Sequence, residues 1–562
     1  MRYRTISTWP LYTALLFALA SCGGATSGIN PATALQGQGT HKGNRPACAP
    51  SGCTTDWASF GFDLQRTGYN PYESSVGVSN VGSLQKVWAF NVDSTMVHEP
   101  VYAYGVKVKR VPTNILYAGS AWGSIIYAIN ADTGAVVWQH TVPHALYTCG
   151  GTTPSQFSIG ETPAIDRGKN LVYVADGHNQ VHAYDLATGR QHAGWPLTVA
   201  NYRNGDHNFM HGGLTYNPAN GLLYAVTGST CDISPWHGRI VAIDTTGPSI
   251  VGTFFTMSGG PSQGASGAGI WGPGGGSIDP STNNVFVATG NADTKHGASQ
   301  HASYAEQVIE LSPTLSTILA NNYPANIPSV PGDGDFDFGA TPLLFQPSGC
   351  PPLLAAVNKS GMFELYDEST ISNGPIQYIS MSIPTDEASF IGVPAYDPET
   401  GYVYVGLPST QGVYQAGMGA FSIASNCTLN TTPVWSAAFG PDGSKTGNQA
   451  PRSPISIANG VVYVSNYTDD TEFAFNAATG ASLWTLSLPS WGNVGTVVAN
   501  GMVYVGAGDG TITAFAPAPS ASKKRKKAVR SAPIPIHGWT PFTPWGRPPT
   551  NVPAARELER LR

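Results

Sequence analysis

A short pattern of strands and turns recurs eight times along the chain, and this repetition limits the possible folds more than any other feature. Each copy has an apolar run, a tight turn rich in Gly, Asp or Asn, and a second apolar run. One residue in the first run marks each copy: Tyr117, Tyr173, Tyr224, Phe286, Leu354, Tyr404, Tyr463 and Tyr504. Successive markers lie 41 to 68 residues apart, which indicates an array of small structural units.

Each copy predicts four short antiparallel strands. The best-defined copy, residues 116–138, reads LYAGSAWGSIIYAINADTGAVVW. Asp, Asn and Gly in its turns supply the positive φ that tight hairpins need. Four-stranded antiparallel units in series are typical of propeller blades. A β-helix or a row of sandwiches is the alternative. Neither explains a Trp five residues after Thr133 and again after Thr479, an offset that favours a docking contact between neighbouring blades.

The two ends of the array complement each other. The last copy stops at Phe515-Ala516 without a closing strand, and an unassigned strand with Trp88 precedes the first copy at residues 84–92. Pairing the two would remove an open sheet edge. We therefore predict an all-β chain in which residues 84–517 form a β-propeller of about eight four-stranded antiparallel blades, closed by an N-terminal strand.

The first residues predict export. Arg2 and Arg4 precede an apolar stretch that is too short to span a membrane, so residues 1–21 are predicted to be a signal peptide. The following Ser-Cys-Gly resembles the lipobox of bacterial lipoproteins, which implies lipidation of Cys22 and an extracytoplasmic, membrane-anchored protein in the periplasm or at the cell surface. The alternative is an ordinary cleaved signal with a chance Cys. Export permits disulfides, but apart from a small loop between Cys48 and Cys53 their pairing cannot be read from the sequence.

The flanking segments differ from the array in composition. Residues 22–83 are a linker and lead-in. Residues 518–562 are a Pro-rich basic tail with KKRKK at 523–527, predicted to be disordered or to tether the chain to anionic lipid or cell-wall polymer. Residues 517–562 hold ten Lys or Arg and two Glu, a charge of +8, so the rest carries −6 − 8 = −14. This acidic body argues against nucleic acid as the main partner.

The Ala-x-Asp-x-x-Thr-Gly-x-x-x-Trp pattern of the copies resembles the repeat of pyrroloquinoline quinone (PQQ) propellers, the quinoprotein alcohol dehydrogenase-like family. Residues 56–71, DWASFGFDLQRTGYNP, resemble the lead-in found before such propellers. The resemblance covers most of the mature chain. It implies the propeller fold but leaves two functions open, because such blades build dehydrogenases and also the non-catalytic lipoprotein of the outer-membrane barrel-assembly machinery.

The resemblance implies a cofactor site in the central copies. In residues 267–291, GAGIWGPGGGSIDPSTNNVFVATGN, it assigns Trp271 to the floor under the quinone and Asn291 to calcium. The chemistry agrees, since a planar quinone packs on an indole face and calcium binds amide and carboxylate oxygens. The alternative is that Trp271 belongs to the core and Thr-Gly-Asn is a hairpin turn.

A second implied calcium ligand is Asp232, in residues 229–244, STCDISPWHGRIVAID. Relatives carry a Glu ahead of Arg-Gly in this blade, and here Asp232 and His237-Gly238 fall near those places. Asp is one methylene shorter than Glu. The alternative is a polar surface loop.

Three aspartates two positions apart occur in residues 331–345, PGDGDFDFGATPLLF. The segment is not an EF-hand loop, because Phe338 replaces the Gly at its sixth position. It resembles the segment that carries the catalytic base of the family. Asp337 is the best match, both as base and as metal ligand, and Asp335 is the second.

A basic residue before a Gly hairpin completes the predicted site. Lys359, in AAVNKSGMFELYD, would contact the quinone, although a Lys beside Ser-Gly also fits a solvated turn. One departure is that Cys149 is followed by Gly150, whereas alcohol dehydrogenases of the family carry adjacent cysteines. The sequence thus predicts a dehydrogenase that uses PQQ and calcium on small alcohol-type substrates. The alternative is a non-catalytic scaffold that binds envelope proteins.

Overall fold

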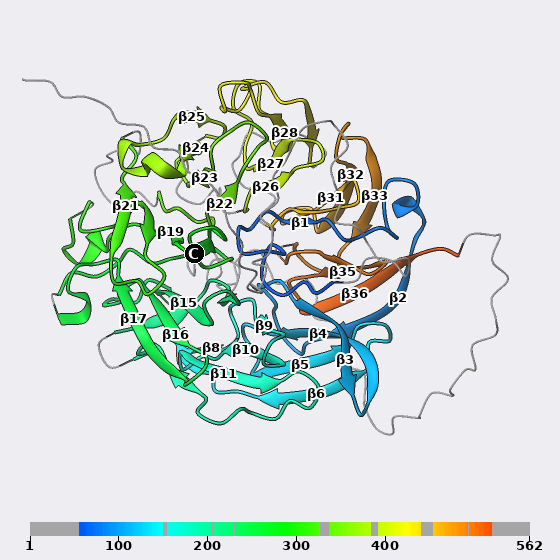
Figure 1. Cartoon of the computed structure of the whole chain (residues 1–562), viewed down its shortest axis with the longest axis horizontal. Helices are drawn as coiled ribbons and strands as arrows, with labels where there is room; N and C mark the ends of the chain where they lie inside the picture. The colour runs from blue at the N-terminus through cyan, green and yellow to red at the C-terminus, as the bar shows by residue number, and fades with distance from the viewer. Residues whose placement is uncertain are drawn as a thin grey trace, which may run out of the picture. The chain divides into compact units, whose positions relative to one another are not determined.

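Eight four-stranded units form a ring in the computed structural model (Figure 1). The structure describes residues 55–519, except 150–153, 204–205, 230, 263, 300, 326–335, 384–391, 440–452 and 493. The predicted signal peptide, Cys22, Cys48, Cys53, Asp335 and nearly all of the basic tail lie outside these residues. Within them the prediction of an eight-bladed all-β propeller is confirmed.

The first four blades follow one another in chain order, and each adds its strands outward from the centre of the ring. Blade 1 has β3 (Val101–Val108), β4 (Val111–Gly119), β5 (Ile125–Asn130) and β6 (Val136–Thr141). Blade 2 has β9 (Ala164–Asp166), β10 (Leu171–Ala175), β11 (Gln180–Asp185) and β12 (Leu197–Thr198). Blade 3 has β14 (Thr215–Asn217), β15 (Leu222–Ser229), β16 (Arg239–Asp244) and β17 (Ser249–Phe255). Blade 4 has β18 (Ser277–Ile278), β19 (Val285–Ala288), β20 (Val308–Leu311) and β21 (Ile318–Asn322).

The second four blades repeat this order. Blade 5 has β22 (Leu343–Phe345), β23 (Leu353–Val357), β24 (Met362–Asp367) and β25 (Gln377–Ser380). Blade 6 has β26 (Ala395–Asp397), β27 (Tyr402–Leu407), β28 (Gly417–Ser422) and β29 (Trp435–Ala438). Blade 7 has β30 (Ser456–Ala458), β31 (Val461–Asn466), β32 (Thr471–Asn476) and β33 (Ser482–Ser487). Blade 8 has β34 (Val497–Ala499), β35 (Met502–Gly506), β36 (Thr511–Pro517) and β2 (Leu84–Asn91).

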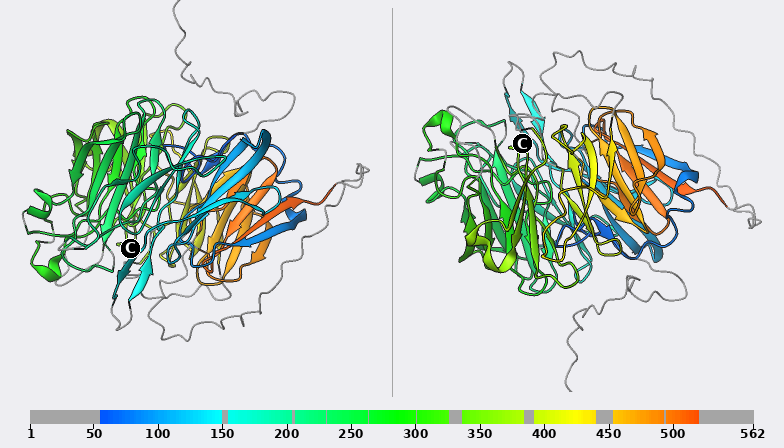
Figure 2. Two further views of the ribbon diagram at one scale, coloured as in Figure 1. Left: turned by 90° about the horizontal axis from the view of Figure 1, so that it is seen from below. Right: turned by 90° about the horizontal axis from the view of Figure 1, so that it is seen from above.

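Shorter elements supplement the blades. β1 (Tyr69–Asn70) pairs with β30, and β13 (Asn208–Met210) pairs with β15. β7 (Ala145–Tyr147) and β8 (Ser155–Phe157) form a separate hairpin that stands out from the ring (Figure 2). The 3-10 helices of the described residues are η1 (Val81–Ser83), η2 (Gly260–Ser262), η3 (Thr294–His296) and η4 (Glu368–Asn373). None of the helices in the described residues is long and apolar enough to cross a membrane.

Ring closure occurs as the sequence predicts. β2 pairs with β36 in antiparallel register, with Trp88 opposite Ala514. The Trp88 indole also reaches the next blade, where its Nε1 donates to the carbonyl of Ala131 at 2.9 Å. Closure therefore combines strand pairing with a docked aromatic side chain.

The same docking contact recurs between other blades. Nε1 of Trp138 in blade 1 donates to the carbonyl of Leu186 in blade 2 at 2.9 Å. A Cβ on Gly189, whose φ is +69°, would lie 2.7 Å from this indole, so glycine is required by both its backbone and its neighbour. Blade 1 thus carries both halves of the contact at a fixed spacing. Its outer-strand Trp138 docks on the Thr-Gly turn of blade 2, and its own Thr-Gly turn receives Trp88 of blade 8.

The lead-in segment, residues 56–70, runs through the centre of the ring and contacts every blade. Six blades form backbone hydrogen bonds with the segment. The blade residues that form them are Tyr102, Ile165, Ile278, Leu344, Tyr396 and Ile457. Arg66 donates to Thr215 Oγ1 in blade 3 at 2.5 Å, and Asn70 donates to the carbonyl of Val498 in blade 8 at 2.8 Å. The lead-in segment precedes the repeats in the sequence, yet in the fold it connects all eight blades at the centre of the ring.

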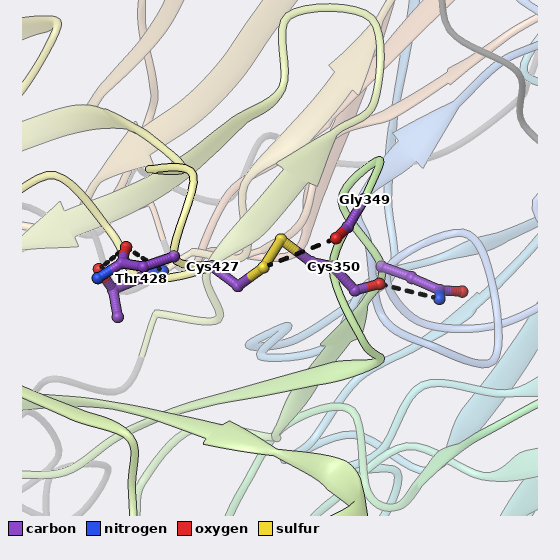
Figure 3. The surroundings of a disulfide bond; sticks show 6 residues. Gly349, Cys350, Cys427 and Thr428 are labelled. Carbon is purple, nitrogen blue, oxygen red and sulfur yellow. Dashed lines mark hydrogen bonds between the residues drawn. A yellow bond between two sulfur atoms is a disulfide. The ribbon is translucent and has the colours of Figure 1, made fainter.

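In the described part of the chain, two disulfides join loops of different blades. Cys350, between β22 and β23, pairs with Cys427, after β28 (Figure 3). Cys149, beyond β7, pairs with Cys231 in the β15–β16 connection. Cys149 therefore has a distant partner, and the second bond attaches the β7–β8 hairpin to blade 3.

Candidate functional site

The predicted site residues lie in connections that share one end of the propeller. Trp271 lies between β17 and β18, and Asp337 lies between β21 and β22. Asn291 follows β19, and Lys359 lies in the β23–β24 turn. In a propeller, connections from the outer strand to the next blade and turns between the second and third strands lie on the same face. Side chains from blades 4 and 5 can therefore converge there.

Asp337 is the centre of this convergence. Its Oδ2 lies 3.0 Å from Nζ of Lys359 and its Oδ1 accepts from the backbone N–H of Asn291 at 2.7 Å. The backbone N–H of Lys359 donates to the carbonyl of Asp337 at 2.9 Å. Asp337 and Lys359 are 2% and 4% exposed. The structure therefore joins three of the predicted residues through one buried ion pair and two backbone contacts.

Trp271 lies next to this ion pair. A Cβ on Gly290 would be 2.1 Å from Asp337 Oδ1 and 2.3 Å from Trp271 Nε1, so only a glycine fits between them. Trp271 is 2% exposed and meets the rings of Trp236 and His211 edge to face, at 5.5 and 5.8 Å. Among the described residues, its buried Nε1 has no hydrogen-bond partner.

Asp232 lies at the edge of the cluster. Its side chain is exposed, and its Oδ1 accepts from Ser229 Oγ at 2.9 Å. Although water reaches the residue, the atoms of the surrounding loops reduce the solvation of its carboxyl. This desolvation, together with the charge of Asp337, raises its pKa to about 6, while the Ser229 hydrogen bond and the charge of Lys359 counteract the rise. Asp232 thus shares the electrostatic environment of the ion pair, but its hydrogen bond goes to its own loop.

The neighbouring His237 belongs to a buried network. His237 Nδ1 and Arg239 Nη2 contact the two oxygens of Asp206 at 2.8 and 2.7 Å. Desolvation would raise the pKa of Asp206, but the His237 hydrogen bond and the Arg239 charge hold it below its usual value. This network fixes the loop that carries Asp232 to the preceding connection.

Sequence reasoning missed Glu306. Its backbone N–H donates to the carbonyl of Gly290 at 2.9 Å, and its side chain is fully buried. Neither carboxyl oxygen makes a hydrogen bond within the described part of the chain, although Nδ1 of His301 lies 3.8 Å from its Oε2. Burial raises the pKa of Glu306 to about 8, and the charge of Asp337 adds to the effect. A single Glu before an apolar strand carries no sequence pattern. Its φ of +54°, rare for Glu, becomes visible only in the structure.

The arrangement offers the groups of an acid–base site. A carboxylate, an ammonium group, an amide and an indole lie together at Asp337, Lys359, Asn291 and Trp271, with a second buried carboxyl at Glu306. In the residues that the structure describes, no three His, Cys, Asp or Glu side chains converge closely enough to hold a metal ion. A cation here would need further oxygen ligands, from amide or backbone carbonyl groups, from water or from another molecule.

Family models match two parts of the chain. Residues 57–198 match the model described as glucose/ethanol/alcohol dehydrogenase, beta-propeller domain. Residues 427–522 match the model described as outer membrane protein assembly factor BamB.

Individual relatives extend the similarity over most of the chain. Polyvinylalcohol dehydrogenase of Pseudomonas sp is 23% identical over 498 residues, 80% of this chain and 73% of the relative. Its counterpart in Sphingopyxis sp. strain 113P3 is 24% identical over 485 residues, 77% of this chain and 70% of the relative. The crystal structure of quinohemoprotein alcohol dehydrogenase from Comamonas testosteroni shares the fold, with a TM-score of 0.59, 18% identity and coverage of 85% of this chain and 82% of that one. The chain thus shares the β-propeller repeats of PQQ-type, quinoprotein alcohol dehydrogenase-like proteins.

Proposed function

We propose that the protein is an exported dehydrogenase that oxidises alcohol groups with PQQ and calcium. The observation that carries this proposal is the convergence of Lys359, Asn291 and Trp271 on the buried carboxylate of Asp337. The relatives named as polyvinylalcohol dehydrogenases support alcohol groups as the substrate. Secondary alcohols of a polymer are the substrate class that we infer from those names.

The residues fit the cofactor in chemical kind. Lys359 would contact the anionic quinone, Trp271 would offer its indole face, and Asn291 and Asp337 would contribute oxygens to calcium, with Asp232 as a further ligand. The buried Nε1 of Trp271, without a partner among the described residues, is a donor that a ligand can use. Since Trp271 is 2% exposed, stacking on it requires displacement of the side chains that cover it.

The roles of the chain's own residues follow from this arrangement. The bound quinone supplies the acceptor for the two electrons and the hydrogen of the alcohol carbon. Asp337 accepts the hydroxyl proton as general base. Asp335, in the same segment, is the second candidate for this role. Lys359 and the N–H of Asn291 hold the Asp337 carboxylate in a fixed orientation.

The proposed location is outside the cytoplasm, with the chain anchored through a lipid at Cys22. The Ser-Cys-Gly sequence after the apolar leader supports it. A palmitate label that is lost in a Cys22→Ala variant would test the anchor. Equal labelling of the variant would rule it out.

A second candidate function is a non-catalytic scaffold for envelope proteins. The match of residues 427–522 to the assembly-factor model favours it. It predicts no response to quinone or calcium.

The deciding experiment measures thermal stability with PQQ, calcium, both or neither. We expect stabilisation only with both, because the cofactor's oxygens complete the calcium site. Asn291→Ala should abolish the joint shift. Asp337→Asn should retain it but lose dye-linked alcohol oxidation, because the base is removed while the shape is kept. If the wild-type protein shows no stabilisation with both ligands, the dehydrogenase proposal fails and the scaffold replaces it.

A further inference from the structure

An aromatic cluster outside the blades lies on the same face as the Asp337 site. Its rings are Trp122, Tyr147, Phe157, Tyr202, Phe209 and Trp491, which we call the hairpin cluster. Tyr147 and Phe157 come from the β7–β8 hairpin that stands out from the ring (Figure 2). The others come from the β4–β5 turn and from connections after β12 and β33. Four separate parts of the chain thus contribute rings to a surface that blade packing does not require.

The cluster presents ring surface to solvent in fixed orientations. Trp122, Tyr202 and Trp491 are partly exposed. The Tyr202 ring stacks on His178 at 4.2 Å and carries the guanidinium of Arg203 at 4.5 Å. Tyr467 extends the row, with its ring 5.4 Å from that of Trp491. Held rings lose little side-chain entropy when a ligand binds.

The row continues to the candidate active site. Phe209 meets His211 at 6.1 Å, and His211 meets Trp271 at 5.8 Å. The Cys149–Cys231 disulfide attaches the hairpin to the β15–β16 connection, in which Asp232 directly follows Cys231. Phe209 and Trp271 are each 2% exposed, so these contacts join the cluster to the candidate site through packed rings, and a chain held on the exposed rings would lie on the same side of the ring as the Asp337 ion pair.

We propose that the hairpin cluster is a binding surface for a neutral, hydroxylated polymer chain and that it guides chain segments to the Asp337 site. This inference deepens the proposed dehydrogenase function and rests on it for the reaction. Aromatic faces pack on the CH groups of such a chain, while indole and imidazole nitrogens bind its hydroxyls. Among the described residues, Nε1 of Trp122 is a buried donor without a partner.

The exposure pattern favours a thin chain over a folded protein partner. A stable protein interface buries roughly 800 Å² on each side. The three solvent-facing rings are each only partly exposed, and the strongly exposed apolar side chain of the hairpin is Leu146, at 60%. The exposed ring area is therefore small, which fits contact with one extended chain better than contact with a folded protein.

The test measures binding of polyvinyl alcohol to the full chain by isothermal titration, without cofactor. We expect Trp122→Leu and Trp491→Leu each to raise the Kd by at least about tenfold, whereas pentane-2,4-diol oxidation by cofactor-loaded protein stays unchanged. Trp484→Leu is the matched control, since Trp484 is a partly buried Trp that packs on Phe515 in blade 8. If the first two variants unfold, Tyr467→Ala gives the same readout from a turn residue.

Two results separate the failure of this inference from that of the proposed function. If folded variants at Trp122, Trp491 and Tyr467 bind the polymer with unchanged affinity, the hairpin cluster is not the polymer-binding surface, even if diol oxidation persists. Polymer binding that depends on these rings would support the surface even if the protein oxidises no alcohol, and the missing oxidation would then count against the dehydrogenase alone.

Discussion

Asp337 and Lys359 form a buried ion pair, with 3.0 Å between Oδ2 and Nζ. Two charges removed from water are stable only together, and removal of one partner typically costs about 3–5 kcal/mol. We predict that Lys359→Met lowers the free energy of unfolding by about this amount, measured by urea denaturation. The double variant Lys359→Met, Asp337→Leu should be less destabilised than Lys359→Met alone. Additive losses would show that the two side chains are not coupled.

The pH dependence of stability should reflect the buried carboxyls. Burial raises the pKa of Glu364 to about 8, although Asn358 and Tyr366 hydrogen-bond to it. The folded state binds the Glu364 proton more tightly than the unfolded state, so protonation stabilises the fold. This stabilisation is complete below the unfolded pKa near 4.5 and is lost as the pH rises to 8. Glu99 and Glu161 have pKa values raised by burial to about the same value.

We therefore expect the melting temperature to fall between pH 5 and pH 8. Glu364→Gln should flatten this slope, since the amide keeps the shape and cannot ionise. Asp132→Asn, at an exposed carboxylate, is the control and should leave the slope as it is. A slope that is identical in Glu364→Gln and wild type would contradict the assignment.

The sequence predicts the blades because their hydrogen bonds are local. Each turn carries its own Gly, Asn or Asp, and the missing strand of blade 8 could be identified by counting strands in the last copy. The convergence of Lys359, Asn291 and Trp271 on Asp337 could be anticipated only from a family resemblance, since these residues come from different blades. Glu306 could not be anticipated, because its burial results from loops packing against each other. The disulfide partners of Cys149 and Cys350 likewise depend on which loops meet.

Arg66 should be the most sensitive residue of the lead-in segment. It is 1% exposed, and its guanidinium donates to Ser59, Phe60, Asp63, Thr215 and Gly276. Arg66→Met would remove all five hydrogen bonds and leave Ser59 Oγ and the Phe60 carbonyl without this buried donor, although Gly276 keeps its bond from Thr215, so we predict a loss of about 3 kcal/mol or more in the free energy of unfolding. Arg167→Met is the control, because the Arg167–Asp56 ion pair is 41% exposed on the Arg side and should cost about 1 kcal/mol or less. Equal losses would refute the central role of Arg66.

Closure of the ring gives the last prediction. The Trp88 side chain is 8% exposed, packs in one cluster with Tyr504 and Leu116, and donates its Nε1 hydrogen to Ala131. Trp88→Ala removes a large buried ring and a docking hydrogen bond at once, so we expect a loss of about 3–5 kcal/mol. Deletion of residues 84–92 should be worse, because it also exposes the edge of β36 to solvent and to other chains.

The two changes should differ in kind as well as in size. Trp88→Ala keeps the strand and should leave a monomer that melts at a lower temperature, as measured by calorimetry and light scattering. The deletion should melt many degrees lower and associate through the unpaired edge. Trp138→Ala in blade 1 is the matched control, because it loses the equivalent docking bond to Leu186 but closes no ring. A closing strand holds the first and last blades together, so its removal must lower the stability of the fold. If the deletion variant melts at the same temperature as the wild type, β2 does not close the propeller.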